Sequence, residues 1–202
     1  MNTSWEELLP KLRADDDYAR SFNAVYGSAP ARAHVLNAFA AFQQSLATPD
    51  ARFDRYLNGQ ADAITKEEER GYQLFKSYGC TACHQGTNLG GNLFKKFGVF
   101  KDQLTKRWRL TSADLGRFAI TGIESDRHVF RVPGLRNVAV TAPYFHDGSA
   151  ASLREAVDIM ARVQLGRELP GQDIELIVKF LGSLTGEYQG RPLSAETDPS
   201  TR

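Results

Sequence analysis

Several residue types and patterns are scarce in this chain of 202 residues, and each absence removes a class of protein. Cysteine occurs only twice, so a scaffold held by several disulfides and a zinc site of four cysteines are both excluded. Basic and acidic side chains nearly balance, with a formal net charge of +1, which argues against a nucleic-acid-binding protein. No apolar run reaches the length of a membrane-spanning helix. With 42% hydrophobic residues the chain can still bury a core.

The patterns that are present are mainly helical, and strand patterns are few. A capping box at Ser4 and Glu7 predicts a first helix, and a second box at Thr65 and Glu68 predicts a helix that ends at Gly79. Apolar residues at helical spacing predict the other helices. These cover 15–26, 30–46, 112–121, a segment capped by Ser152 that carries Met160, and 172–184. Short loops and helices are expected over 92–130, and polar residues around Gly59 predict a linker.

Both cysteines lie in one pentapeptide, Cys80-Thr81-Ala82-Cys83-His84, which is the attachment sequence of a c-type haem. Each thiol adds to one vinyl group of the porphyrin, so the two sulfurs must reach neighbouring edges of one flat ring. The histidine directly after the second thiol then gives the iron an imidazole ligand. We therefore predict one covalently bound haem c held by Cys80 and Cys83, with His84 on the iron.

Three other interpretations of this pentapeptide are weaker. A zinc site would need two more Cys or His residues at ligand spacing, and the chain has no second pair. A thioredoxin-like redox pair would need a strand–helix–strand context, which the sequence does not indicate. A structural disulfide that spans only two residues would be strained.

The second iron ligand has few candidates, namely Met1, Met160, His34, His128 and His146. Met1 is at a terminus, whereas Met160 lies on the apolar face of a helix that follows the haem motif and precedes one more helix. In class I cytochromes c the haem motif, the methionine ligand and a final helix follow one another in this same order. A thioether ligand on the iron favours the ferrous state. Met160 is therefore the first candidate and His146 the second. A methionine that only fills the core remains an alternative.

At this point the chain resembles a known family, the bacterial di-haem cytochrome c peroxidases, which include the di-haem enzyme of the methylamine pathway. The run that ends in His146-Asp147-Gly148 is very specific to that family. The matching residues include Arg52-Phe53-Asp54-Arg55-Tyr56-Leu57, the haem motif with Gly86, Gly90-Gly91, Asp114, Gly116-Arg117, Val132-Pro133, Leu135-Arg136-Asn137, Thr141-Ala142-Pro143-Tyr144-Phe145, Ala156-Val157, Met160 and Gln164-Leu165-Gly166.

The resemblance implies a fold and a division into domains. The family has two cytochrome domains, and this chain matches the C-terminal one and the last helices of the N-terminal one. We expect an all-α fold in which residues 62–188 form a class I cytochrome c-like domain with covalent haem. Residues 1–58 would be about three helices of an incomplete N-terminal, peroxidatic domain, and residues 189–202 a disordered tail.

The resemblance also implies iron and calcium ligands. In the family the C-terminal haem has His and Met ligands, which here are His84 and Met160. A calcium ion lies between the family's domains, and the backbone carbonyls of Thr141 and Pro143 fall on two matching positions. Carbonyl oxygens suit such a hard cation, although they supply only part of a shell.

Three further side chains are candidates for the surroundings of the haem: Arg117, Arg136 and His146. A guanidinium matches the carboxylate geometry of a haem propionate. Both arginines could equally well be structural and donate to loop carbonyls. Trp108 and His128 receive no role.

The departures from the family decide what the sequence predicts about function. The first haem motif and the segment with the acidic residue that acts on peroxide are absent. We expect an electron-transfer module that takes electrons from a small donor, a cytochrome c or a copper protein, and passes them to a peroxide-reducing haem. Its partner would be a missing N-terminal haem domain or a second copy in a homodimer. Whether the chain is itself an enzyme stays open.

Two alternatives remain. An active cytochrome c peroxidase would need an open iron position and an acid–base group, for which His146 or Glu124 are the candidates. A non-catalytic haem-binding remnant would need neither. Covalent haem attachment implies a periplasmic location, yet Met1–Glu7 lacks the basic end and apolar stretch of a signal peptide. We therefore expect a removed leader or a fragment of a longer protein.

Overall fold

The computed structural model describes residues 3–100 and 111–194. It divides the chain into two compact units, one that ends at Ala47 and one that begins at Thr48. Helices dominate both units, which confirms the prediction of a mainly helical chain within the described residues. None of the helices in those residues is long and apolar enough to cross a membrane.

The first unit consists of three helices, α1 (Trp5–Ala14), α2 (Asp16–Tyr26) and α3 (Arg32–Ser45). The Ser4 hydroxyl accepts a hydrogen bond from the Glu7 amide, which is one half of the predicted capping box. Asp15 caps α2 in the same way. The Tyr26 ring stacks on His34 with 4.5 Å between the ring centroids, so His34 packs inside this unit.

Several large apolar side chains of the first unit are exposed. Val35 is its one buried helical residue, whereas Val25 is 73% exposed. Four residues at helical spacing form an apolar stripe along α3: Leu36, Phe39, Phe42 and Leu46. We call them the α3 stripe. Three helices with so little buried surface gain little free energy from their own packing.

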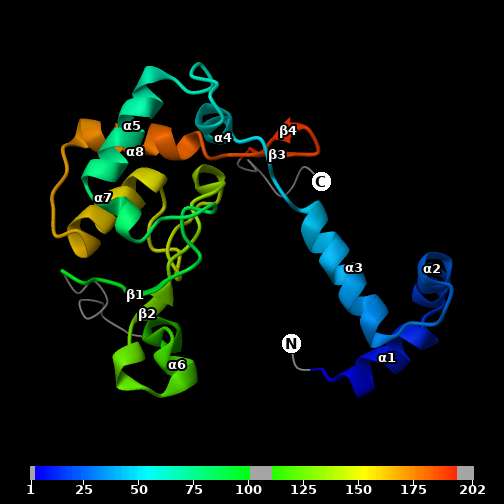
Figure 1. The fold of residues 1–202 in the computed structure, drawn as a ribbon. Helices are drawn as coiled ribbons and strands as arrows, with labels where there is room; N and C mark the ends of the chain where they lie inside the picture. The colour runs from blue at the N-terminus through cyan, green and yellow to red at the C-terminus, as the bar shows by residue number, and fades with distance from the viewer. Residues whose placement is uncertain (1–2, 101–110, 195–202) are drawn as a thin grey trace. The chain divides into compact units, whose positions relative to one another are not determined.

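The second unit contains the remaining helices and four short strands (Figure 1). Its α-helices are α4 (Arg52–Leu57), α5 (Lys66–Ser77), α6 (Phe118–Thr121), α7 (Leu153–Gln164) and α8 (Gly171–Gly182). Its 3₁₀ turns are η1 (Cys80–Ala82), η2 (Ser112–Leu115), η3 (Glu124–Asp126) and η4 (Val138–Val140). The strands pair antiparallel, β1 (Phe94–Lys96) with β2 (Val129–Arg131) and β3 (Glu187–Tyr188) with β4 (Arg191–Pro192).

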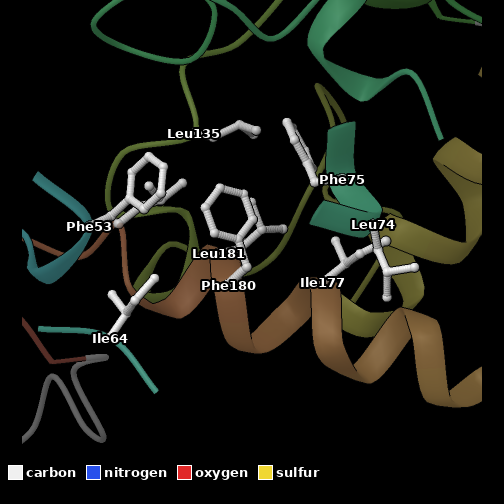
Figure 2. Packing of buried hydrophobic residues seen from close by; sticks show 9 residues of the cluster. Phe53, Ile64, Leu74, Phe75, Leu135, Ile177, Phe180 and Leu181 are labelled. Carbon is white, nitrogen blue, oxygen red and sulfur yellow. The ribbon is translucent and has the colours of Figure 1, made fainter. Parts of the chain in front are cut away.

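The core of the second unit forms where α5 crosses α8. Phe180 of α8 is fully buried, and its ring contacts Phe75 of α5 and Phe53 of α4 at centroid distances of 5.3 and 5.1 Å. Figure 2 shows these three rings facing one another, with Leu135 reaching in from a loop. The capping box at Thr65, with Glu68 as its partner, is complete and fixes the start of α5.

The boundary between the two units differs from the predicted one. The sequence predicts an N-terminal segment of residues 1–58, but α4 belongs to the second unit. The reason is that Phe53 is only 3% exposed and its amide donates to the Ser183 carbonyl at 3.1 Å. Arg52 of α4 also forms an ion pair with the buried Glu68. Burial alone would raise the pKa of Glu68, but hydrogen bonds from Arg52 and the Thr65 backbone hold it below its usual value.

Two other segments also differ from the expectation. The predicted helix over 112–121 is broken into η2 and α6, because Gly116 between them has a φ of 59°. The sequence predicts a disordered tail over 189–202, yet residues 187–192 form the β3–β4 hairpin. This hairpin is held by the Glu187 amide, which donates to the Pro49 carbonyl at 2.9 Å. Residues 195–202 lie outside the described residues.

Gly71 should control how closely α5 approaches α8. A Cβ atom at this position would overlap the backbone carbonyl oxygen of Leu176, so Gly71→Ala must push the two helices apart. We expect a loss of about 1–3 kcal/mol in the free energy of unfolding, measured by urea denaturation. Gly182→Ala is the matched control, since a Cβ there would meet nothing within 4 Å. The control should be neutral or gain up to about 1 kcal/mol. Equal effects of both substitutions would contradict the close-contact explanation.

Candidate functional site

The cysteine motif forms one tight turn directly after α5. Gly79 has a φ of 91°, in the left-handed region that ends the helix, and η1 follows at once. The amides of Cys83 and His84 both donate to the Cys80 carbonyl, at 3.2 and 3.0 Å. The turn therefore brings the backbone of the two cysteines and of His84 close together. Both thiols are free and half-buried.

The surroundings of the Cys80 thiol lower its reactivity. Cys80 packs against the core cluster around Phe180, and burial raises the pKa of its thiol to about 11. A thiol with this pKa is almost entirely protonated at neutral pH, so it is a poor nucleophile in the folded chain.

The imidazole of His84 is oriented by the loop that follows it. Its Nδ1 atom lies 3.1 Å from the Leu89 carbonyl oxygen. A carbonyl only accepts hydrogen bonds, so Nδ1 carries the hydrogen and Nε2 keeps its lone pair. Burial lowers the pKa of His84, although backbone hydrogen bonds to Leu89 and Pro133 oppose this effect. The ring is thus a neutral imidazole at neutral pH, which is the form that binds metal.

A second loop holds the first one in place. The Gly91 amide donates to the Val132 carbonyl at 2.8 Å, and the Leu135 amide donates to the Asn88 carbonyl at 3.0 Å. Gly90, with a φ of 136°, is so close to this second loop that a Cβ atom would overlap the Pro133 carbonyl. Gly90 therefore allows the backbones of the two loops to pack in close contact.

Met160 lies in the same unit, half-buried on α7. Both α5, which leads into the motif, and α7 pack against α8. The unit has two buried apolar clusters, one around Phe180 and one around Ile159 of α7. They share Val138 and Leu153 as partners, and Met160 belongs to neither. Within the described residues, Met160 is therefore not a packed member of the core.

Thr141 and Pro143 are exposed residues in the loop after η4, on either side of Ala142. The Ala142–Pro143 peptide bond is cis. The Thr141 hydroxyl donates to the Val138 carbonyl at 3.2 Å. In the part of the chain that the structure describes, no three His, Cys, Asp or Glu side chains gather in a way that could hold a metal ion. This gives no support to the zinc alternative either.

His146 pairs with a carboxylate that the sequence did not single out for any role. Its Nε2 atom lies 2.9 Å from an oxygen of Asp114, which is only 1% exposed. The Asp114 carboxylate also accepts hydrogen bonds from the Thr111 amide and hydroxyl, at 2.6 and 2.8 Å. The Asp114 carbonyl bonds Nδ1 of the buried His128 at 2.8 Å. One feature of the sequence could have indicated that Asp114 has a structural role. Thr111 and Asp114 have the spacing of a capping box, which they form in the structure.

The two arginines that were candidates for haem propionates have partners in the protein. Arg136 makes a two-pronged ion pair with Asp54, both distances being 2.7 Å, and donates to the Thr87 carbonyl at 2.8 Å. Arg117 lies 3.2 Å from Asp126. Of the other candidates, Glu124 is exposed and pairs with Arg127, while Met1 and Trp108 lie outside the described residues.

The donor set in this unit fits a haem c. It offers two free thiols in one turn, a neutral imidazole with a fixed tautomer, and a thioether outside the packed clusters. Thioether bonds, an imidazole ligand and a methionine ligand are the attachments that a c-type haem uses.

Comparisons with known proteins agree with this chemistry. The family model described as "Di-haem cytochrome c peroxidase" matches residues 1–62. Cytochrome c peroxidase Ccp of Escherichia coli is 44% identical over 92% of this chain and 39% of its own length. Cytochrome c551 peroxidase of Pseudomonas aeruginosa is 46% identical over 80% of this chain and 48% of its own length.

More distant relatives include the methylamine utilization protein MauG of Methylorubrum extorquens. It is 34% identical over 78% of this chain and 43% of its own length. A crystal structure of a MauG-like protein associated with microbial copper homeostasis superposes with a TM-score of 0.73 at 30% identity. That match covers 89% of this chain and 61% of the other. The chain thus spans about half or less of the length of these curated relatives.

Burial of Cys80 predicts how its thiol reacts in the haem-free protein. A Cys83→Ser variant leaves Cys80 as the single thiol, and its alkylation by iodoacetamide can be followed by mass spectrometry. Because the pKa of Cys80 is about 11, the rate should rise about tenfold per pH unit from about pH 8 to pH 10 without a plateau.

The control is the same variant in denaturant, where the rate should level off near the ordinary cysteine pKa of about 8.5. A plateau near that value without denaturant would show that Cys80 is not buried.

Proposed function

The chain belongs to the di-haem cytochrome c peroxidase family, and on this premise we propose that it is the electron-transfer part of such an enzyme. It would hold one haem c through Cys80 and Cys83, with His84 and Met160 as the iron ligands, in a class I cytochrome c-like domain. In the complete enzyme this part would relay electrons from a small donor, a cytochrome c or a copper protein, to the peroxide-reducing haem. The observation that carries the proposal is the Nδ1 contact of His84 with the Leu89 carbonyl.

That contact would suit His84 to bind the haem iron. The Leu89 carbonyl holds the hydrogen on Nδ1 and fixes the ring orientation, which leaves Nε2 free to bind and makes it more basic. A bound haem would supply a one-electron couple between ferric and ferrous iron. A sulfur ligand from Met160 would favour the ferrous state and raise the reduction potential. The buried side chains around Phe180 and Ile159 would exclude water.

Two properties of the chain support a second component that carries the other haem. The motif at residues 80–84 uses both cysteines, so a second haem could not be attached here in the same way. The α3 stripe exposes four large apolar side chains within the segment that the family model matches. We propose that this stripe contacts the peroxidatic haem domain or a second copy of the chain, and that peroxide is reduced outside this chain.

The alternative of an independent peroxidase has no specific observation in its favour. The two acid–base candidates, His146 and Glu124, are paired with Asp114 and Arg127 respectively. A calcium ion bound by the carbonyls of Thr141 and Pro143 and a periplasmic location stay part of the proposal, from the family resemblance.

Substitution of Met160 tests the ligand set. The ferric, haem-loaded chain should show the weak sulfur-to-iron charge-transfer band of a His/Met haem, and Met160→Leu should abolish it. Leucine keeps the volume and the apolar character, so packing is largely preserved. The far-ultraviolet circular dichroism spectrum serves as the control for folding. A low-spin spectrum that keeps the band in Met160→Leu would show that another residue binds the iron.

Peroxide turnover tests the proposal that peroxide is reduced outside this chain. The haem-loaded chain with its iron closed by Met160 should reduce hydrogen peroxide far more slowly than the ~1–10³ s⁻¹ of typical enzymes, with a reduced cytochrome c as donor. The Met160→Leu variant, with an open iron position, is the comparison. A wild-type rate within the usual range of enzymes would contradict the proposal and revive the peroxidase alternative.

A further inference from the structure

The β1–β2 ribbon has an exposed face that carries none of the proposed haem thiols or iron ligands. Phe94 of β1 lies directly opposite Arg131 of β2, and Lys96 follows two residues later on the same face. Phe94 is 52% exposed, and the Arg117 guanidinium lies over its ring at 5.2 Å from the centroid. We call these four residues the ribbon face. It combines an exposed aromatic ring with three basic side chains, of which Arg117 is paired with Asp126.

Beside the ribbon face the surface is hollowed. The hollow has a volume of about 470 Å³, and its lining includes Asn88, Gly91, Pro133, Arg131 and Arg136. Arg131 donates from Nε to the Gly91 carbonyl at 2.6 Å, which fixes its guanidinium at the edge of the hollow. Arg131 therefore belongs to both the ribbon face and the hollow, which form one continuous surface.

Two of the basic side chains of this surface are not neutralised by a partner within the described residues. Among the residues that the structure describes, neither Lys96 nor Arg131 makes an ion pair, so the terminal nitrogens of Arg131 stay available. Arg117 and Arg136, in contrast, are paired with Asp126 and Asp54. A fixed guanidinium with free terminal N–H groups is suited to a carboxylate, which it can bind with two hydrogen bonds.

We propose that this surface docks an acidic electron-donor protein, with one of its carboxylates in the hollow at Arg131 and an apolar residue on Phe94. The inference rests on the proposed function and adds the chemistry of the donor to it. One electron would leave the donor and reduce this chain, with no bond made or broken. An interface with a small apolar centre and a charged rim gives weak complexes that form and dissociate rapidly. Electrostatic attraction between the partners increases their rate of association.

The position of the surface fits this role. The hollow is lined by the two loops that carry the hydrogen-bond partners of His84, since Asn88 and Gly91 flank Leu89 and Pro133 lies in the facing loop. A protein docked there would contact the loops that hold the iron ligand. A second copy of this chain is a poorer occupant, because the positive charges at Lys96 and Arg131 would face each other across a two-fold axis.

The test measures binding of plastocyanin, a small acidic copper protein, to the haem-loaded chain by NMR titration, with both proteins oxidised so that no electron moves. Mitochondrial cytochrome c, which is basic, is the contrasting probe. We expect plastocyanin to bind more tightly than cytochrome c. The affinity for plastocyanin should fall at least fivefold when the salt concentration rises from about 20 to about 200 mM.

Charge reversal locates the surface. Arg131→Glu and Lys96→Glu should each weaken plastocyanin binding about fivefold to tenfold at low salt. Lys95→Glu is the matched control, because Lys95 has the same charge on the same strand but pairs with Phe130 on the opposite face. Its effect should stay below about twofold. The Lys96 side chain makes no hydrogen bond within the described residues, so Lys96→Glu remains informative if loss of the Arg131–Gly91 contact disturbs folding.

Three outcomes would overturn the inference: tighter binding of cytochrome c, equal effects of Lys95→Glu and Lys96→Glu, or a dimer in sedimentation experiments that Phe94→Ser dissociates. These are distinct from failure of the proposed function. That failure would appear in the spectrum of the haem-loaded chain as a missing sulfur-to-iron band, whatever the binding result.

Discussion

The close contact between α5 and α8 is the constraint on which the rest of the second unit depends. Gly71 allows the α5 backbone to lie against the carbonyl of Leu176, and this approach brings Phe75 and Phe180 into one core. The chain leaves α5 through Gly79 directly into the cysteine turn, so the helix crossing also decides where the two thiols and the His84 ring lie. If α5 and α8 lay farther apart, the core would loosen and the candidate site would be displaced with it.

Polar side chains connect this core to the loops around it. The Arg136–Asp54 pair joins α4 to the loop after β2, and the Tyr78 hydroxyl donates to Asp173, which joins the end of α5 to the start of α8. Each pair joins segments far apart in sequence. In partly buried surroundings such charge-assisted bonds are stronger than at a free surface, and they restrict the loops that carry the backbone partners of His84.

The sequence predicts the parts of this structure that are local. The cap at Thr65, the cap at Ser152 and the left-handed glycine after α5 each act over a few residues, and each lies where it was expected. Contacts between distant segments were not predicted, because no periodicity reports them. The pair between the buried Asp114 and His146 joins residues 32 positions apart. The β3–β4 hairpin depends on a carbonyl of Pro49, and α4 owes its place to Phe53 contacting Phe180.

The burial of Cys80 has a consequence for the order of events during biogenesis. In the folded chain its half-buried sulfur packs against the core cluster and is held as a protonated thiol, whereas bond formation to a porphyrin vinyl group needs an accessible, reactive sulfur. Attachment at Cys80 would therefore have to precede closure of α5 onto α8. The cofactor would then act as a template on which these helices assemble, and the maturation machinery would have to recognise the cysteine turn while the chain is still open.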